Sequence, residues 1–229
     1  MTEQVLGILG GMGPAATVEL YRRLTEATAA SSDQDHPRII IDSNAKVPDR
    51  TAALLDGGPD PTPFLLDSLT TLQAAGVDVI VMPCNTAHAY LEVIREHASV
   101  PGVDMVERTA AAAPAEGPIG LLATSGTIEV GLYQDALATR DLEVVLPNDD
   151  DQAAAMRAIH HIKAGDVQAA IPDAERAATA LEQAGAKAII LGCTEFSVLA
   201  VHHQLSLPTV DPLDTLVRAA LDHLGIRSR

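Results

Sequence analysis

The sequence predicts an α/β protein of two pseudo-symmetric domains, each a mainly parallel sheet flanked by helices, with the active site in the cleft between them. Three observations predict this fold. Short apolar segments typical of buried strands alternate with segments of helical periodicity along the 229 residues. Such alternation is typical of parallel sheets covered on both faces. The two halves of the chain also resemble each other, and each contains one cysteine directly after a strand-like segment.

The first half begins with an apolar strand-like segment and the glycine-rich turn Gly10-Gly11-Met12-Gly13-Pro14. Pro14 suits the first turn of a helix, because its fixed backbone angle is already helical there. Gly76 is expected to end a helix just before the strand that leads to Cys84. The expected strands are 5–9, 38–42 and 77–82, and the expected helices are 15–28, 64–75 and 86–98.

The second half repeats this pattern after Pro101. Gly165 is the expected C-cap of a long helix, and Gly185 leads into the strand before Cys193. The expected strands are 119–123, 142–146 and 186–191. The expected helices end at 115, run from the polar turn 124–127 through Tyr133 to 138, and span 149–164, 172–184 and 213–224.

The halves match in motif and in spacing. The segment from Gly7 to Tyr21 aligns with the segment from Gly120 to Tyr133. Gly7 precedes Cys84 by 77 residues, and Gly120 precedes Cys193 by 73. We expect one domain at 1–100 with the C-terminal helix region 209–229, and a second at 101–208. Duplicated halves commonly pack about a pseudo-twofold axis, which would put the two cysteines on opposite walls of one cleft.

The composition excludes several classes of function. The net charge is −16, there is no tryptophan, and phenylalanine and tyrosine total five, whereas nucleic-acid binding needs basic patches and stacking aromatics. No apolar run approaches the roughly 20 residues of a membrane span, and the first residues do not resemble a secretion signal. We therefore expect a cytoplasmic protein with no nucleic-acid or membrane partner. Its cysteines should be reduced there.

The two cysteines are the strongest candidates for chemistry. Each follows a strand and precedes a helix, where amide groups and the helix dipole lower the pKa of a thiol. The chain lacks a Cys-X-X-Cys motif, and its histidines show no ligand spacing with Cys84 or Cys193. Two opposed thiols suit two-base proton transfer, in which one thiolate removes a proton and the other thiol returns one on the opposite face. The alternatives are two structural thiols or one disulfide.

Polar residues at the helix starts suit an anionic substrate. Asn85-Thr86 and Thr194-Glu195 add amides and hydroxyls at the helix starts that suit a substrate carboxylate, and Thr124, Ser125 and Thr127 form a polar turn. Ordinary helix capping is the alternative for these residues. Arg50 and Lys163 are candidate cations for a substrate carboxylate, and the alternative for both is a surface charge.

The glycine turn permits a rival hypothesis. Gly11-Met12-Gly13-Pro14-Ala15-Ala16 follows a strand and fits G-x-G-x-x-A, and Asp42 ends the next strand, as in a dinucleotide-binding fingerprint. A nicotinamide-dependent enzyme is therefore an alternative. That hypothesis leaves the duplication and both cysteines unexplained.

Several motifs in register along nearly the whole chain resemble the cofactor-independent aspartate racemases of the aspartate/glutamate racemase superfamily. They are Gly-Ile-Leu-Gly-Gly-Met-Gly-Pro (7–14), Val-Pro-Asp-Arg-Thr (47–51), Met-Pro-Cys-Asn-Thr-Ala-His (82–88), Leu-Ala-Thr-Ser-Gly-Thr (122–127), Lys-Ala-Gly (163–165), Gly-Cys-Thr-Glu (192–195) and Asp-Pro (211–212).

The resemblance implies a homodimeric racemase of aspartate, a small dicarboxylic amino acid, that uses no pyridoxal phosphate, metal or nucleotide. It implies that Cys84 and Cys193 are the acid/base pair, that Arg50 and Lys163 meet the side-chain carboxylate, and that Thr194 helps to hold the α-carboxylate. A glutamate racemase or maleate isomerase of the same superfamily is the alternative. The expected substrate-binding residues are Met12, Asp49, Arg50, Thr51, Asn85, Thr86, Ala87, Thr124, Thr127, Lys163, Thr194 and Glu195.

Overall fold

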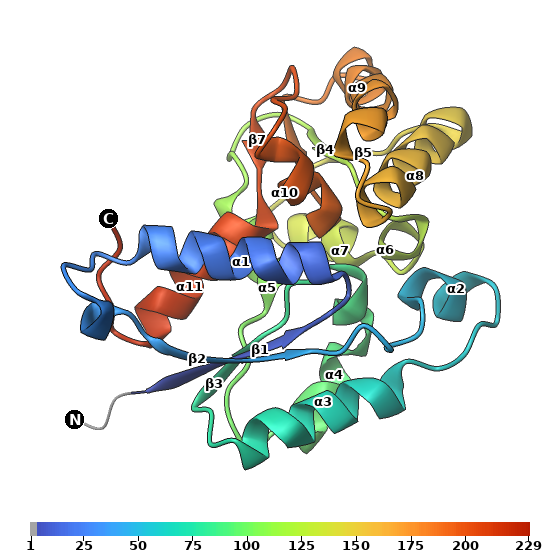
Figure 1. Ribbon diagram of the computed structural model, residues 1–229. Coiled ribbons are helices and arrows are strands. Elements are labelled where there is room, and N and C mark those ends of the chain that lie inside the picture. Colours follow the sequence, from blue (N-terminus) through green and yellow to red (C-terminus); the bar gives the residue numbers. More distant parts are fainter. Residues whose placement is uncertain (1–3) are drawn as a thin grey trace. The chain divides into compact units, whose positions relative to one another are not determined.

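The computed structural model describes residues 4–229 and divides them into two compact units (Figure 1). The first unit comprises 4–105 with 213–229, and the second comprises 106–212. Each unit contains a parallel sheet with helices packed against it. The predicted α/β fold class is therefore confirmed.

The first unit has a three-stranded parallel sheet in the order β2-β1-β3. Its strands are β1 (Val5–Gly10), β2 (Arg38–Ser43) and β3 (Val79–Val81). Its helices are α1 (Pro14–Ala27), α2 (Arg50–Leu55), α3 (Thr62–Ala74), α4 (Leu91–His97) and α11 (Pro212–His223), with short 3-10 helices η1 (Asp33–Asp35) and η2 (Thr86–Tyr90).

Alternating side chains of β1 build the core of the first unit on both faces of the sheet. Leu6 and Ile8 pack with buried leucines of α1 and α11, whereas Val5 and Leu9 pack with those of α3. Figure 1 shows these helices on opposite sides of the strands. All six β1 residues are buried, as expected for the central strand of a sheet covered on both faces.

The second unit has a four-stranded parallel sheet in the order β5-β4-β6-β7. Helices α8 and α9 supply the core on one face, and α5 and α7 supply it on the other. The strands are β4 (Ile119–Leu121), β5 (Val144–Val145), β6 (Ala188–Ile190) and β7 (Thr209–Val210). The helices are α5 (Met105–Ala112), α6 (Ser125–Glu129), α7 (Leu132–Ala138), α8 (Asp149–Lys163), α9 (Val167–Gln183) and α10 (Thr194–Ala200).

The two sheets share one register at the strands that lead to the cysteines. Gly7 of β1 pairs with Ile80 of β3, and Gly120 of β4 pairs with Ile189 of β6. Ile80 and Ile189 each lie four residues before a cysteine. The repeated motifs of the sequence therefore occupy equivalent positions in the two sheets.

Three local details differ from the predictions. Helix α9 begins at Val167 instead of 172 and carries Pro172 inside it, because its alanine face is buried and Asp166 caps it at Ala169 N. The helix expected to run from the polar turn to 138 is broken at Gly131, whose φ of 72° is left-handed. Helix α2 is not among the expected helices; it begins at Arg50, with Asp49 as its N-cap.

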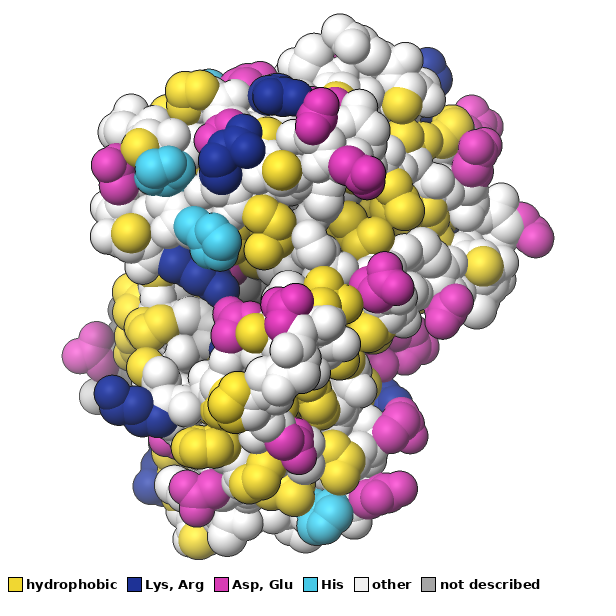
Figure 2. Space-filling view, turned by 90° about the vertical axis from the view of Figure 1, so that its right-hand side faces the viewer, with side chains coloured by type: hydrophobic (Ala, Val, Ile, Leu, Met, Phe, Trp, Pro, Cys, Tyr) yellow, Lys and Arg dark blue, Asp and Glu magenta, His cyan; other side chains and the backbone are white. Residues whose placement is uncertain are grey.

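The surface carries the excess of acidic residues. Figure 2 shows acidic side chains scattered over the face in view, with fewer basic ones among them. The largest helices are amphipathic, and within residues 4–229 none combines the length and apolar character needed to cross a bilayer.

Candidate active site

In the first unit the predicted residues gather at the carboxyl ends of two neighbouring strands. The turn 10–13 follows β1, and Cys84 follows β3, which pairs directly with β1. Ligands of open parallel sheets bind beyond such carboxyl ends. Met12 and Cys84 are both buried, with 3% and 5% of their surface exposed.

Arg50 is built into this edge as the first residue of α2. Its guanidinium is buried and donates to the carbonyl of Met12 (2.9 Å), to that of Pro48 (3.0 Å) and to that of Val47 (3.4 Å). The bond to Met12 ties the turn after β1 to the start of α2. The fork of N–H donors on a guanidinium matches the two oxygens of a carboxylate, so Arg50 remains a candidate ligand for an anion. Asp49 caps α2 at Ala52 N (2.9 Å).

The glycines of the first turn are explained by contacts within the unit. A Cβ on Gly10 would lie 2.6 Å from the Thr17 side chain, and one on Gly11 would lie 2.4 Å from the Asn44 backbone. The Gly11 N–H donates to Thr17 Oγ1 (2.9 Å), and that hydroxyl donates to Gly13 O (3.2 Å). A phosphate ligand is therefore not needed to account for the G-x-G-x-x-A pattern.

The segment after Cys84 turns into a short 3-10 helix instead of the longer α-helix expected. Asn85, Thr86 and Ala87 are buried in it. His88, which the sequence analysis did not select, closes the segment. Its Nδ1 lies 2.8 Å from the Cys84 carbonyl, and its Nε2 accepts from the Met105 N–H at 3.2 Å.

These two bonds fix the tautomer of His88. A carbonyl oxygen only accepts, so Nδ1 carries the hydrogen, and Nε2 is left as the acceptor for Met105. Burial lowers the pKa of His88 below its ordinary 6.5; the bond to the Cys84 carbonyl and the charge of Asp104 oppose this shift, and Arg95 adds to it. His88 is therefore a neutral side chain that holds the carbonyl of Cys84 in place.

In the second unit, the polar turn after β4 is a helix cap. Thr124 Oγ1 accepts from Thr127 N (3.1 Å) and lies 3.0 Å from Thr127 Oγ1, and both residues are buried. Gln152 of α8, which the sequence analysis missed, donates to Ala123 O (3.1 Å) and Ser125 Oγ (3.2 Å). The capping alternative is thus correct for the hydroxyl of Thr124.

Cys193 follows β6 and is the N-cap residue of α10. Its thiol donates to Glu195 Oε2 at 2.9 Å, and both side chains are about 5% exposed or less. Burial raises the pKa of Cys193 well above its ordinary value, the negative charge of Glu195 raises it further, and the charge of Lys163 opposes both. Cys193 is therefore a protonated thiol at neutral pH. Glu195 is thus a predicted substrate ligand whose bond to the Cys193 thiol the sequence did not reveal.

The remaining predicted residues lie around these centres. Thr194 is buried beside Cys193, Thr51 is half-buried on α2, and Lys163 is an exposed residue at the end of α8. Both cysteines are free thiols, so the disulfide alternative is not what the structure contains.

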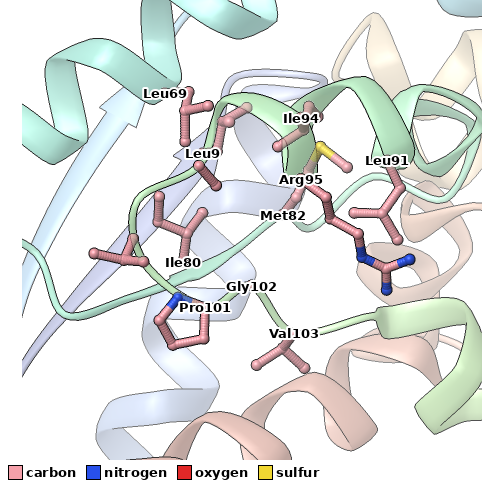
Figure 3. A pocket seen from close by; sticks show the side chains of 12 residues that line it. Leu9, Leu69, Ile80, Met82, Leu91, Ile94, Arg95, Pro101, Gly102 and Val103 are labelled. Carbon is pink, nitrogen blue, oxygen red and sulfur yellow. The ribbon is translucent and has the colours of Figure 1, made fainter.

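The first unit also contains an apolar hollow of about 320 Å³ on the α4 side of β3 (Figure 3). Ile80 and Met82 line it, and Arg95 lies at one side of the apolar side chains, paired with Glu92 (2.6 Å) and Asp104 (3.0 Å). None of the predicted site residues lines this hollow. This hollow is thus formed by other side chains than those of the edge that carries Cys84.

Comparison with known proteins identifies the relatives of this chain. A broad specificity amino-acid racemase of Bacillus subtilis is 30% identical over 243 residues, which cover 95% of this chain and 96% of the relative. A glutamate racemase of Mycobacterium leprae is 34% identical, over 59% of this chain and 50% of its own length. The structure of Picrophilus torridus aspartate racemase is similar with a TM-score of 0.88 and 29% identity, over 99% of this chain and 96% of that one.

The family model for Asp/Glu/Hydantoin racemases matches residues 9–220. The matched range includes both cysteine segments, the Arg50 turn and the polar turn at Thr124. Together with the relatives above, this match shows that the chain is a racemase and belongs to the Asp/Glu/hydantoin racemase family.

Proposed function

We propose that this protein interconverts L- and D-aspartate without a cofactor, by two-base proton transfer between Cys84 and Cys193. The observation that carries the proposal is the shared register of the two sheets, which places each cysteine four residues beyond an equivalent strand pairing. The similarity to an aspartate racemase over 99% of the chain supports the choice of substrate. The proposal requires both thiols to reach one substrate molecule.

In the proposed reaction, one cysteine acts as a thiolate and takes the α-proton, while the other gives its thiol proton to the opposite face of the same carbon. Cys193 is a thiol hydrogen-bonded to Glu195, so it is suited to donate. When Cys193 donates its proton, Cys84 is the base that removes the α-proton. After turnover Cys84 holds the proton and Cys193 is a thiolate. The starting state returns when Cys84 loses its proton to water and Cys193 gains one from water, and the carboxylate of Glu195 is placed to relay that incoming proton.

The substrate carboxylates would select the orientation. Arg50 is held rigidly by three backbone carbonyls, and with Lys163 it is proposed to receive the side-chain carboxylate. Donors of Asn85, Thr86 and Thr194 would stabilise charge that builds on the α-carboxylate. Met12 and Thr127 would line the pocket, and the neighbouring residues Asp49, Thr51, Ala87 and Thr124 complete the proposed set.

A broader amino-acid racemase is the second candidate. It is favoured by the 30% identity to a broad specificity racemase over 95% of the chain. The family also contains glutamate racemases, one of which matches 59% of this chain. A guanidinium that meets a second carboxylate would exclude neutral side chains, so the role of Arg50 decides between the candidates.

The test is a racemisation assay on purified protein with no added cofactor. L-Aspartate, L-glutamate and a panel of neutral L-amino acids are incubated separately, and the products are separated by chiral chromatography. We expect D-aspartate as the dominant product, and Arg50→Lys should raise KM for aspartate at least tenfold. Equal turnover of neutral amino acids by wild type would support the second candidate.

We also propose a cytoplasmic location, which a cell-fractionation blot would test.

A further inference from the structure

A buried pair of side chains joins helix α10 to the end of strand β7 in the second unit. Ser197 of α10 donates from its Oγ to Asp211 Oδ1 at 2.6 Å. Ser197 has no exposed surface, and Asp211 is 9% exposed. Asp211 belongs to the Asp-Pro motif at 211–212 and is not one of the predicted substrate-binding residues. The proposed reaction therefore gives this buried carboxylate no role.

The length and the burial of this bond indicate a strong, charge-assisted contact. An O–H donor typically lies about 2.5–2.7 Å from an ionised carboxylate oxygen, and such bonds are roughly twice as strong as those between neutral groups. A carboxylate that leaves water is costly unless hydrogen bonds replace its contacts with water. Asp211 therefore holds the Ser197 hydroxyl, and with it the helix that carries this hydroxyl, in one place.

Strand β7 brings Asp211 to the same edge of the sheet as Cys193. Strands β6 and β7 are parallel neighbours, and Ile190 pairs with Val210. Leu191 N donates to Val210 O at 3.1 Å, so the pairing extends to the residue directly before Asp211. Cys193 follows two residues after Leu191. One strand pairing therefore supports both the cysteine and the carboxylate.

Ser197 lies one helical turn beyond Cys193. Cys193 is the N-cap residue of α10, and a spacing of four residues brings two positions to the same side of a helix. Glu195, which accepts the hydrogen bond of the Cys193 thiol, lies between them in the first turn. A bond that fixes Ser197 therefore fixes the turn that carries both partners of the thiol bond.

Apolar packing alone would hold α10 less specifically. Phe196 and Leu199 of this helix are each 1% exposed and pack in the core cluster that contains Cys193. Such packing is non-directional, so it opposes separation of the helix from the core more than a small rotation of the helix. A hydrogen bond has a narrow range of distance and angle. The bond between Ser197 and Asp211 thus adds a directional restraint to this packing.

We propose that Ser197 and Asp211 are positioning residues, which hold α10 so that the Cys193 thiol stays within hydrogen-bond distance of Glu195. They act through the backbone of the helix and not on the substrate. The inference rests on the proposed function, because it concerns the geometry of a cysteine that is proposed to transfer a proton.

Titration of the Cys193 thiol tests this role directly, by thiolate absorbance in a Cys84→Ala background. S197A deletes the hydroxyl without changing any charge, and it leaves in place Glu195 and Lys163, the charged groups that act on this thiol. The pKa of Cys193 should fall, because a loosened α10 lets the negative charge of Glu195 move away from the sulfur.

S206A is the matched control for this titration. Ser206 Oγ donates to Glu182 Oε2 at 3.1 Å in the same unit, and this bond between a serine and a carboxylate is exposed. S206A should leave the pKa of Cys193 unchanged, because the bond that it removes does not involve α10.

Steady-state kinetics of aspartate racemisation, in protein that keeps Cys84, provide a second readout. S197A should lower kcat about tenfold and leave KM within about twofold, because proton transfer depends on the position of Cys193 while the substrate-binding side chains are unchanged. D211N keeps an oxygen acceptor and should retain more activity than D211A. Adding S197A to D211A should lower kcat no further, since both changes remove one bond.

The purely structural explanation predicts a different result. S197A with the Cys193 pKa and the kcat of wild type, even at a lower melting temperature, would overturn the proposal. Equal pKa changes in S197A and S206A, or additive losses of kcat in S197A and D211A, would also overturn it. Failure of the proposed function is distinguishable, because Cys193→Ala would then racemise aspartate fully, while the titration would still report whether Ser197 positions the thiol.

Discussion

The two cysteine segments begin in the same way and then diverge. Both cysteines lie four residues after a matched strand pairing and are about 5% exposed. Cys84 is followed by a 3-10 helix, and His88 holds its carbonyl from inside the unit. Cys193 caps an α-helix, and Glu195 accepts a hydrogen bond from its thiol. One segment controls the backbone of its cysteine, whereas the other controls the proton.

The pKa of the Cys193 thiol depends on its burial and on its direct contact with Glu195. Glu195 acts on the Cys193 sulfur itself and raises the pKa of the thiol, together with burial. His88 touches only the backbone of Cys84 and reaches no sulfur. Two repeats of one fold can therefore keep the same strand pairing while the side chains around their cysteines differ.

Removal of either thiol should have the largest effect. Cys84→Ala and Cys193→Ala should each lower racemisation by about 10³-fold or more, because each deletes one of the two groups proposed to transfer the proton. The two variants should keep slow exchange of the α-hydrogen in D₂O, each with the opposite enantiomer of aspartate. Proton NMR would measure this exchange. Full racemisation by either variant would refute the two-base mechanism.

Replacement of Glu195 should have the next largest effect, and this effect should be confined to the segment that carries Cys193. Glu195→Gln keeps a hydrogen-bonding group but removes the negative charge, so the Cys193 pKa should fall. Racemisation should drop by roughly 10–100-fold, since an amide cannot relay a proton from water to the Cys193 thiolate as the carboxylate is proposed to do. Thiolate absorbance of Cys193, titrated in a Cys84→Ala background, measures the shift. An unchanged titration would mean that Glu195 does not act on this thiol.

His88 should affect stability more than proton transfer. Asn at this position can imitate Nδ1 and keep the bond to the Cys84 carbonyl, whereas Gln can imitate Nε2 and keep the bond to Met105. Each variant leaves one buried group without its partner, which costs about 1–3 kcal/mol of unfolding free energy. His88→Asn should keep KM and kcat near wild type, and His88→Gln should lower kcat because the carbonyl of Cys84 is released. Urea unfolding and steady-state kinetics measure the two effects, and identical kinetics of the two variants would contradict this role.

The pH dependence of stability checks the same residue. The folded-state pKa of His88 lies below 6.5, so below pH 6.5 the unfolded chain binds a proton that the folded chain does not. The contribution of neutral His88 is complete above this pH and is lost as pH falls toward the folded-state pKa. The stability difference between wild type and His88→Asn should therefore be larger at pH 7.5 than at pH 5.5. A difference that grows on acidification would show that the folded-state pKa is raised instead.

The smallest effect concerns the residue before each cysteine. The first segment has Pro83 there and the second has Gly192. A Cβ on Gly192 would lie 2.7 Å from Leu121 Cδ1 and 2.8 Å from Ala123 Cβ, so Gly192→Ala should cost about 1–3 kcal/mol through overpacking. Gly102→Ala, whose Cβ would meet only Ile80 O at 3.8 Å, is the matched control and should be nearly neutral. Thermal unfolding compares them, and equal melting temperatures would refute the crowding.

The sequence was sufficient to predict the features that depend on periodicity and repetition. Strand β1, the glycine turn after it and the two strands that lead to the cysteines were expected where the structure has them, because apolar runs and glycines at turns are local signals. The position of Pro172 inside α9 was not expected. Burial of the alanine face against α8 outweighs the tendency of proline to break a helix. The break at Gly131 was not predicted either, because a glycine within a helical pattern does not by itself indicate a left-handed backbone.

The site was predicted as a set of residue types, without its internal bonds. Arg50 could be chosen for its charge, but its anchoring by Met12 joins residues 38 positions apart and depends on the fold. The contact between His88 and Met105 likewise spans 17 positions, and no local pattern reveals it. Only the motif neighbours, such as Cys193 and Glu195, were close enough in sequence for a pairing to be inferred, and that bond was still missed.

The distribution of thiols gives each unit its own reporter of local opening. The chain has two cysteines, one in each unit, and both are buried and free. A thiol-labelling reagent can reach either one only when the structure around it opens. In the Cys84→Ala and Cys193→Ala variants, the labelling rate would therefore measure opening of the second unit and of the first unit separately, without any added probe.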